Sequence, residues 1–224
     1  MTIDDNTAKP TASNESMTPA IMSGQDALAR LMAGNTRYVE SLTQSDVIPK
    51  RPELVAEQRP FAIILGCSDA RVPVEIVFDQ GLGDLFVIRV AGNIVAPSQI
   101  GSIEFAVEQF GTRLVVVLGH SNCGAVTACV DTLMHPEQKY SPALQSIVDR
   151  IRPSVHNLHE MATATGSKID ETTFLEQSIK ANVRASVNHL KHGSRLLEDM
   201  SGAGELLIVG AEYSLQTGGV TLLD

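Results

Sequence analysis

The sequence predicts an α/β fold in which helices flank a mostly parallel β-sheet. Four apolar runs rich in β-branched residues lie at 61–66, 85–91, 113–118 and 205–210. Such continuous runs, rather than alternating ones, are typical of strands covered on both faces. Helical stretches lie between these runs, and alternation of strands with helices indicates a parallel sheet.

The N-terminal part of the chain has two regions. Residues 1–20 are polar with few large apolar side chains, so we expect them to be disordered or arm-like. Ser23 is the expected N-cap of a helix that runs to about residue 42 with apolar side chains at helical spacing. Pro49 and Pro52 then mark a loop and a new short helix.

Helices account for most of the remaining chain. Two are expected at 97–110 and 123–134, between the strand runs. The region 141–200 also has mostly helical character, and we expect it to break at Pro153 and at a polar turn around Gly166.

The length of the chain favours one domain, and its closing segment favours a further strand. The closing segment TGGVTLLD is suited to an edge strand. A chain of 224 residues is long enough for one sizeable domain and short for two. We therefore expect residues 21–224 to form a single α/β domain.

Composition excludes several classes of partner. The net charge of −9 and the pI near 5.1 argue against nucleic acid, which requires clustered Lys and Arg. No apolar stretch approaches the ~20 residues that span a bilayer, so we expect no membrane partner. Three cysteines suggest no disulfide framework and fit a reducing compartment. The first residues also lack the apolar core of a secretory signal, and we expect a cytoplasmic protein.

Chemically distinctive residues gather in two motifs. CSDARV follows the first predicted strand, and GHSNCGA follows the third. Both motifs therefore lie at the carboxyl ends of buried parallel strands, where open α/β sheets bind their ligands.

Cys67, His120 and Cys123 are the candidate metal ligands. His120 and Cys123 are three residues apart across a strand-to-helix turn, and Cys67 approaches from another strand end. Thiolate and imidazole both suit zinc, and three protein ligands leave the open fourth position of a catalytic site. For each residue alone a buried core position is the favoured interpretation, but the three together at strand ends favour a metal.

Asp69 and Arg71 are the candidate catalytic pair. They flank Ala70, and an Arg beside an Asp keeps the carboxylate ionised and holds it by bidentate hydrogen bonds. Two roles are open for Asp69: to orient a zinc-bound hydroxide, or to swing onto the metal and block it. Arg71 favours the first role by holding the carboxylate away.

These motifs resemble those of the β-class carbonic anhydrases. His120 follows Cys67 by 53 residues, which joins CSDARV to HSNC as in that family. The resemblance runs from about Ser23 to the C-terminus. It includes FVIRVAGNIV (86–95), GSIEFAV (101–107) and GAEYSLQTG (210–218).

The resemblance implies zinc held by Cys67, His120 and Cys123, with Asp69 and Arg71 as the catalytic dyad. The implied reaction is reversible hydration of CO2 to bicarbonate and a proton by attack of zinc-bound hydroxide. Because two thiolates make zinc a weaker Lewis acid, we expect activity to rise with pH. The substrate-binding positions implied by the family are Gln58, Phe86, Ala91, Phe105 and Gly124.

The family also implies an assembly. Its members are dimers at minimum, with the N-terminal helical arm packing on a partner subunit, so a homodimer or homotetramer is expected. Ala91 stands where plant-like members commonly carry Val, and Ile64 stands where bicarbonate-regulated members carry Trp. The absent Trp favours an open, constitutively active site.

Two alternative functions remain open. Hydrolysis of CS2 or COS occurs on similar folds with the same zinc ligands. A non-catalytic, zinc-stabilised assembly protein is the second alternative, although a purely structural site would not need Asp69 and Arg71. Cys129 is expected to be a buried helix residue outside the site. The five histidines other than His120 have no evident link to the site, and most are expected on the surface.

Overall fold

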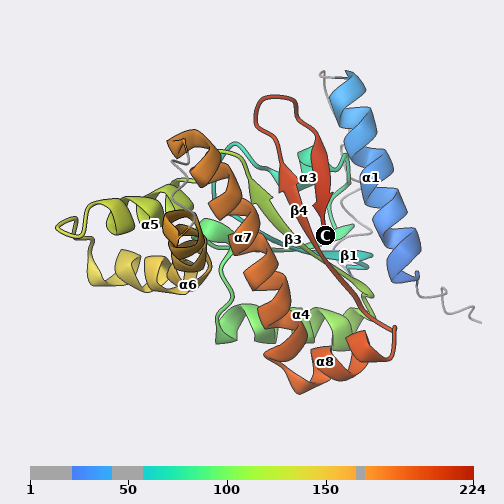
Figure 1. Cartoon of the computed structure of the whole chain (residues 1–224). Helices are drawn as coiled ribbons and strands as arrows, with labels where there is room; N and C mark the ends of the chain where they lie inside the picture. Colours follow the sequence, from blue (N-terminus) through green and yellow to red (C-terminus); the bar gives the residue numbers. More distant parts are fainter. Residues whose placement is uncertain (1–21, 42–57, 165–169) are drawn as a thin grey trace, which may run out of the picture.

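The computed structural model describes residues 22–41, 58–164 and 170–224, and its five strands form one sheet in the order β2-β1-β3-β4-β5 (Figure 1). Strands β1 to β4 pair in parallel, and β5 pairs antiparallel with β4 at one edge. The predicted fold class and the predicted C-terminal edge strand are confirmed. The strands are β1 Ala62–Gly66, β2 Leu85–Arg89, β3 Leu114–His120, β4 Leu207–Tyr213 and β5 Val220–Leu223.

Helices cover both faces of the sheet and extend beyond the strand tips (Figure 1). Helices α1 and α3 pack on one face, and α4, α7 and α8 pack on the other. A third apolar cluster, formed with α5 and α6, lies at the carboxyl ends of the strands and includes Cys67 and Cys123. The helices are α1 Gly24–Ser41, α3 Val74–Val77, α4 Pro97–Phe110, α5 Gly124–Met134, α6 Pro142–Ala164, α7 Glu171–His192 and α8 Arg195–Gly202, with a 3-10 turn η1 at Ala91–Asn93.

The break expected at Pro153 is wrong, because α6 continues through this residue. Val148, Ile151 and Val155 are all fully buried on the same helix, against α5 and α7. Proline removes one backbone hydrogen bond, and burial of this apolar face on both sides of Pro153 offsets that loss. The turn expected around Gly166 lies outside the described residues.

The N-terminal predictions are confirmed where the structure describes them. Ser23 caps α1, since its hydroxyl oxygen accepts a hydrogen bond from the Asp26 N–H at 3.1 Å. Ala27 and Leu31 are fully buried against the chain's own sheet, and packing of this helix on a partner stays a prediction. Residues 1–20 and the loop and short helix predicted around Pro49 and Pro52 lie outside the described residues.

One buried side chain joins α1 to the C-terminal end of the chain. Asn35 Nδ2 donates to the carbonyl oxygens of Val77 and Gly218 at 2.9 and 3.0 Å. Its Oδ1 accepts from the Val220 N–H at 2.9 Å. Asn35 is 5% exposed, so these three bonds satisfy an otherwise costly buried amide.

Within the part of the chain that is described, no helix is both long and apolar enough to cross a membrane.

Candidate metal centre

The centre lies where two neighbouring strands end. β1 and β3 pair in parallel with Gly66 opposite Leu118, so their carboxyl ends reach the same edge of the sheet. Cys67 directly follows β1, His120 is the last residue of β3, and Cys123 immediately precedes α5. The two predicted motifs therefore meet at one place.

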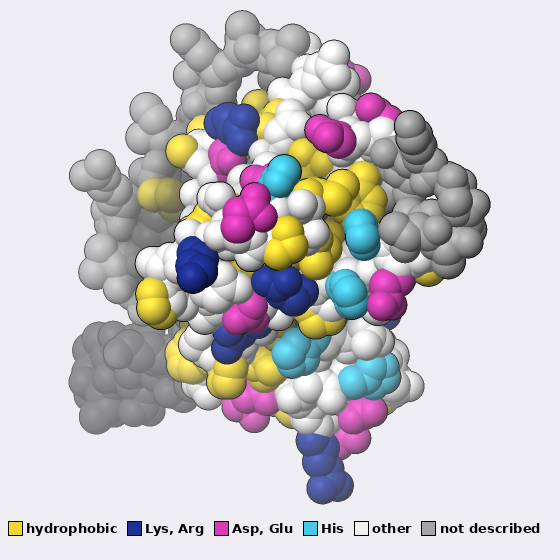
Figure 2. Space-filling view, turned by 60° about the vertical axis from the view of Figure 1, so that its left-hand side comes forward, with side chains coloured by type: hydrophobic (Ala, Val, Ile, Leu, Met, Phe, Trp, Pro, Cys, Tyr) yellow, Lys and Arg dark blue, Asp and Glu magenta, His cyan; other side chains and the backbone are white. Residues whose placement is uncertain are grey.

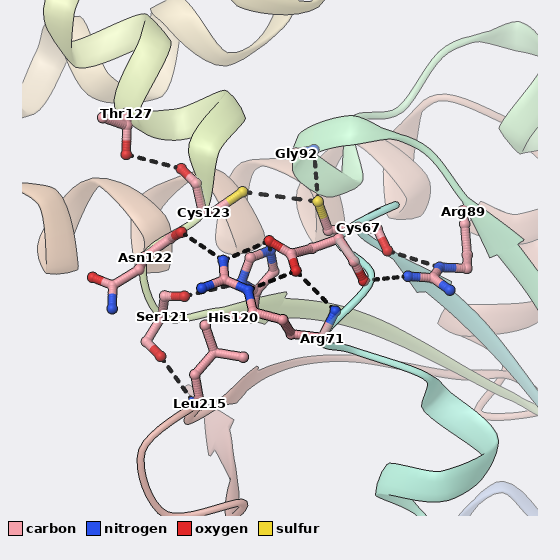
Figure 3. Close-up of polar contacts among 11 residues, drawn as sticks. Cys67, Arg71, Arg89, Gly92, His120, Ser121, Asn122, Cys123, Thr127 and Leu215 are labelled. Carbon is pink, nitrogen blue, oxygen red and sulfur yellow. Dashed lines mark hydrogen bonds and ion pairs between the residues drawn. The ribbon is translucent and has the colours of Figure 1, made fainter.

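Cys67, His120 and Cys123 place one possible ligand atom each within 4.8 Å of one another, and all three side chains are buried. The two Sγ atoms are 3.9 Å apart (Figure 3). Within the described ranges, this is the one group of three or more His, Cys, Asp or Glu side chains with such spacing. The arrangement is that of a soft-donor site for a single metal ion.

The ring of His120 is oriented for ligation. Its Nδ1 lies 2.9 Å from the carbonyl oxygen of Ser121, an acceptor, so Nδ1 carries the proton and donates it. That tautomer leaves a lone pair on Nε2. Nε2 is buried and has no hydrogen-bond partner among the described residues. A metal ion on Nε2 would satisfy this atom, and the backbone carbonyl supplies the usual outer support of a ligating imidazole.

The two thiols are electrostatically coupled. The Cys123 thiol, then the His120 ring and the Gly92 N–H, lower the pKa of Cys67 against the opposing effect of burial. The same contact with Cys67, together with burial, raises the pKa of Cys123. The protein alone therefore favours one thiolate and disfavours the second beside it. A divalent cation supplies the positive charge that a second thiolate requires, so the donor set fits a metal.

Asp69 is fixed beside this group by Arg71. Arg71 Nε donates to Asp69 Oδ1 at 2.9 Å, and its terminal nitrogen donates to Oδ2 at 2.7 Å. The Arg71 N–H also donates to Oδ1, at 3.0 Å. These bonds hold the pKa of the Asp69 carboxyl well below its usual range. Oδ2 lies 3.9 Å from His120 Nε2, so an ionised carboxylate stands next to the ligand atoms and is held there by Arg71.

Two residues in contact with the centre were not identified from the sequence. Arg89, at the end of β2, donates from Nε to the Cys67 carbonyl at 2.9 Å and from a terminal nitrogen to the Asp69 carbonyl at 2.5 Å. The Gly92 N–H donates to Cys67 Sγ at 3.3 Å (Figure 3). Both residues lie more than twenty positions from Cys67, and only the stretch FVIRVAGNIV, which contains them, pointed to this region.

Three of the predicted substrate-binding positions are placed as follows. Ala91 begins η1, next to Gly92 and the sulfur of Cys67. Gly124 is the first residue of α5 and is exposed, and a Cβ added there would meet no atom within 4 Å. Gln58 is exposed in the irregular segment that leads into β1. Ala91 and Gly124 thus adjoin ligand residues, whereas no described hydrogen bond joins Gln58 to the centre.

Phe86 and Phe105 form a separate aromatic cluster with Phe110. Their ring centroids lie 5.6 to 6.3 Å apart, on β2 and α4. Phe86 pairs with Ile63, four residues before Cys67, which corresponds to roughly 13 Å along a strand. Phe105 is 51% exposed. Within one chain, these rings are therefore apart from the ligand atoms.

Three further histidines are surface residues, as expected. His135, His156 and His192 are 66, 51 and 61% exposed at the side chain, each near a glutamate. Figure 2 shows several imidazoles on one face of the molecule, separated from one another by other side chains. Cys129 is fully buried in α5, as predicted, and burial raises its pKa to about 11.

Comparisons with known proteins agree with this geometry. The carbonic anhydrase family model matches residues 62–220. A carbonic anhydrase of Mycolicibacterium smegmatis is 40% identical over 195 residues, covering 86% of this chain and 89% of that protein. Carbonic anhydrase 2 of Mycobacterium tuberculosis is 38% identical over 197 residues, covering 87 and 90%.

Solved structures share the fold. A β-carbonic anhydrase of Aspergillus fumigatus has a TM-score of 0.66 at 26% identity and covers 89% of this chain and 90% of that one. A tetrameric β-carbonic anhydrase of Sordaria macrospora has a TM-score of 0.69 at 21% identity and covers 88 and 97%. The chain therefore belongs to the β-carbonic anhydrase family of enzymes.

Proposed function

We propose that this protein is a zinc-dependent lyase, a carbonate dehydratase that interconverts CO2 and water with bicarbonate and a proton. The observation that carries the proposal is the buried group of Cys67, His120 and Cys123, with the Asp69–Arg71 pair beside it. Family membership and the relatives named carbonic anhydrase support the reaction.

Zinc is the metal that this donor set suits best. Two thiolates and one imidazole are soft and borderline ligands, and three of them leave a position open for chemistry. When bound, zinc would lower the pKa of a water molecule and so supply hydroxide near neutral pH. Cys67, His120 and Cys123 would hold it, with the unpaired Nε2 of His120 as the imidazole donor.

Asp69 and Arg71 orient the nucleophile in this proposal. The carboxylate stays ionised and accepts a hydrogen bond from the attacking hydroxyl group, which directs its lone pair toward carbon. Arg71 uses three donors to keep Asp69 in place and away from the metal position. The same pair argues against a purely structural metal site, which needs no ionised carboxylate beside its open position.

We assign substrate binding to the positions implied by the family. The backbone N–H of Gly124, at the start of α5, suits an oxygen of bicarbonate, because helix N-termini favour negative charge. Ala91 would form part of the pocket wall beside Cys67. Gln58, Phe86 and Phe105 remain proposed substrate contacts that lie apart from the centre of their own chain.

A homodimer or homotetramer accounts for the position of these rings. β2 is an edge strand of the sheet, and Leu82 and Phe105 near it are 59 and 51% exposed. We propose that a second copy covers this apolar edge, where the Phe86 and Phe105 rings would adjoin the partner's site, and that the N-terminal arm also packs on that copy. The Sordaria relative is tetrameric, which supports assembly.

We place the protein in the cytoplasm. Its three cysteines are free, and two of them serve as thiol ligands in the proposal. Reducing compartments preserve such thiols, whereas oxidising ones favour disulfides.

Stopped-flow CO2 hydration between about pH 6.5 and 9, on protein of measured zinc content, tests the function. Rapid turnover that rises with pH at one zinc per chain is the expected result. Full zinc content without CO2 turnover at any pH would contradict it. The same protein assayed with CS2 and COS would then separate a hydrolase of those substrates from a non-catalytic protein.

A further inference from the structure

Side chains of helix α7 donate two hydrogen bonds to the turn η1. Asn182 Nδ2 donates to the carbonyl oxygen of Gly92 at 2.8 Å, and Ser186 Oγ donates to that of Asn93 at 3.1 Å. Asn182 and Ser186 are one helical turn apart and are 2 and 5% exposed. One buried face of α7 therefore supplies donors to two consecutive carbonyl groups.

The two residues that α7 holds have an uncommon backbone conformation. Gly92 and Asn93 have φ of +69° and +44°, in the left-handed region. The positive φ at Gly92 favours glycine, the residue least restrained by its own side chain, and a Cβ there would lie 2.8 Å from Ile151 Cδ1 and 3.1 Å from Ala125 Cβ. The conformation of Gly92 must be fixed by its surroundings, and Asn182 is the side chain that bonds to its carbonyl.

The two bonds differ in what they act upon. The N–H of Gly92 donates to Cys67 Sγ at 3.3 Å, on the opposite side of the same Cα from the carbonyl that Asn182 holds. The N–H of Asn93, the residue held by Ser186, instead donates to the Val90 carbonyl at 3.0 Å. Only the Asn182 bond restrains a residue that contacts a ligand atom.

We propose that Asn182 is a positioning residue for Cys67. Its bond to Gly92 keeps the Gly92 N–H directed at the sulfur and so limits the negative charge that this thiolate donates to a metal. The inference rests on the metal site of the proposed function. Outer groups that hydrogen-bond to ligands tune the metal in this way.

A limit on the charge donated by Cys67 would matter at this centre because two of its proposed ligands are thiolates. Two thiolates donate more charge than imidazoles do, which weakens the metal as a Lewis acid. An N–H directed at one of the sulfurs offsets part of that donation. Because Asn182 is 90 residues from Gly92, helix α7 sets this property from outside the ligand motifs.

The test compares Asn182→Leu with Ser186→Ala in protein loaded with Co²⁺, whose thiolate-to-metal charge-transfer absorption reports the charge on sulfur. We expect this band to move to longer wavelength in Asn182→Leu and to stay unchanged in Ser186→Ala. Zinc affinity, measured by competition with a chelator, should fall roughly tenfold in Asn182→Leu alone, because Gly92 would no longer hold the Cys67 sulfur in its ligating position and this loss outweighs the stronger charge donation. Both variants remove one buried donor from η1, so a merely structural role would affect them alike.

If Asn182→Leu does not fold, Asn182→Ser, which removes the amide without adding an apolar side chain, is measured in its place. A band that is present in the unaltered protein and shifts in neither Asn182 variant would overturn the inference alone. Absence of any thiolate–cobalt band in the unaltered protein would overturn the metal site and this inference together.

Discussion

Two buried thiol environments of the molecule contrast sharply. Cys67, 6% exposed, lies at the tip of β1 among another thiol, an imidazole and the Gly92 N–H, which lower its pKa. Cys129, fully buried six residues beyond Cys123, lies among apolar side chains of α5 and α6, and burial raises its pKa to about 11. Burial is common to both, so polar partners, rather than burial, distinguish the proposed ligand thiol from the packing thiol.

Cys67→Ser should have the largest effect. A hydroxyl group is a poor zinc ligand at neutral pH, so we expect zinc content to fall from one per chain toward zero and CO2 turnover to be lost with it. Metal analysis after gel filtration measures this. Cys129→Ala is the matched control and should keep full zinc, and unchanged zinc in Cys67→Ser would refute the ligand assignment.

Asp69→Asn tests the charged group beside the ligand thiols. The amide keeps the size of the side chain but removes the carboxylate, so we expect turnover to fall by about 10²-fold or more while zinc is retained. Stopped-flow assays and metal analysis on the same sample separate the two quantities. Intact turnover would remove Asp69 from the mechanism.

Alkylation of metal-free protein compares the thiols directly. At pH 8, a thiol with a pKa of about 11 is ionised in only about one molecule in a thousand, so Cys129 should stay protonated and unreactive. We expect iodoacetamide to label the Cys67–Cys123 pair at least tenfold faster, as read by peptide mass spectrometry. Equal labelling in the folded protein would show that the two environments do not differ in this way.

The smallest effect is expected from Cys129→Ala in zinc-loaded protein. Loss of one buried sulfur leaves a small cavity. We therefore expect the free energy of unfolding to decrease by about 1 kcal/mol. Urea unfolding measures this. A loss of several kcal/mol, or any loss of zinc, would mean that Cys129 supports the metal centre rather than only the helix packing.

The sequence predicted what local patterns encode. The bounds of α4 at 97–110 were exact, because Pro97 begins the helix and Gly111, in the left-handed conformation, ends it. The tip of β1 at Gly66 was predicted because the apolar run stops where CSDARV begins, whereas β3 continues to His120, two residues beyond its predicted run. The break at Pro153 was wrong, because tertiary packing outweighed a local preference.

Long-range support for the site could not be predicted in the same way. Arg89 and Gly92 reach Cys67 only through the sheet order, and Asn182 reaches Gly92 only through the packing of α7. None has a spacing relative to Cys67 that a local period would reveal. The clustering of Phe86 and Phe105 with Phe110, apart from the ligands, likewise depends on strand register and the position of α4.

The three bonds of Asn35 have a consequence for the order in which the protein is made. Two of them end at Gly218 and Val220, which follow Asn35 by 183 and 185 residues. During synthesis, α1 leaves the ribosome long before this part of its docking site. Its final seating must therefore wait until residues 218–220 have also emerged, because the Asn35 amide lacks two of its three bonds before that point.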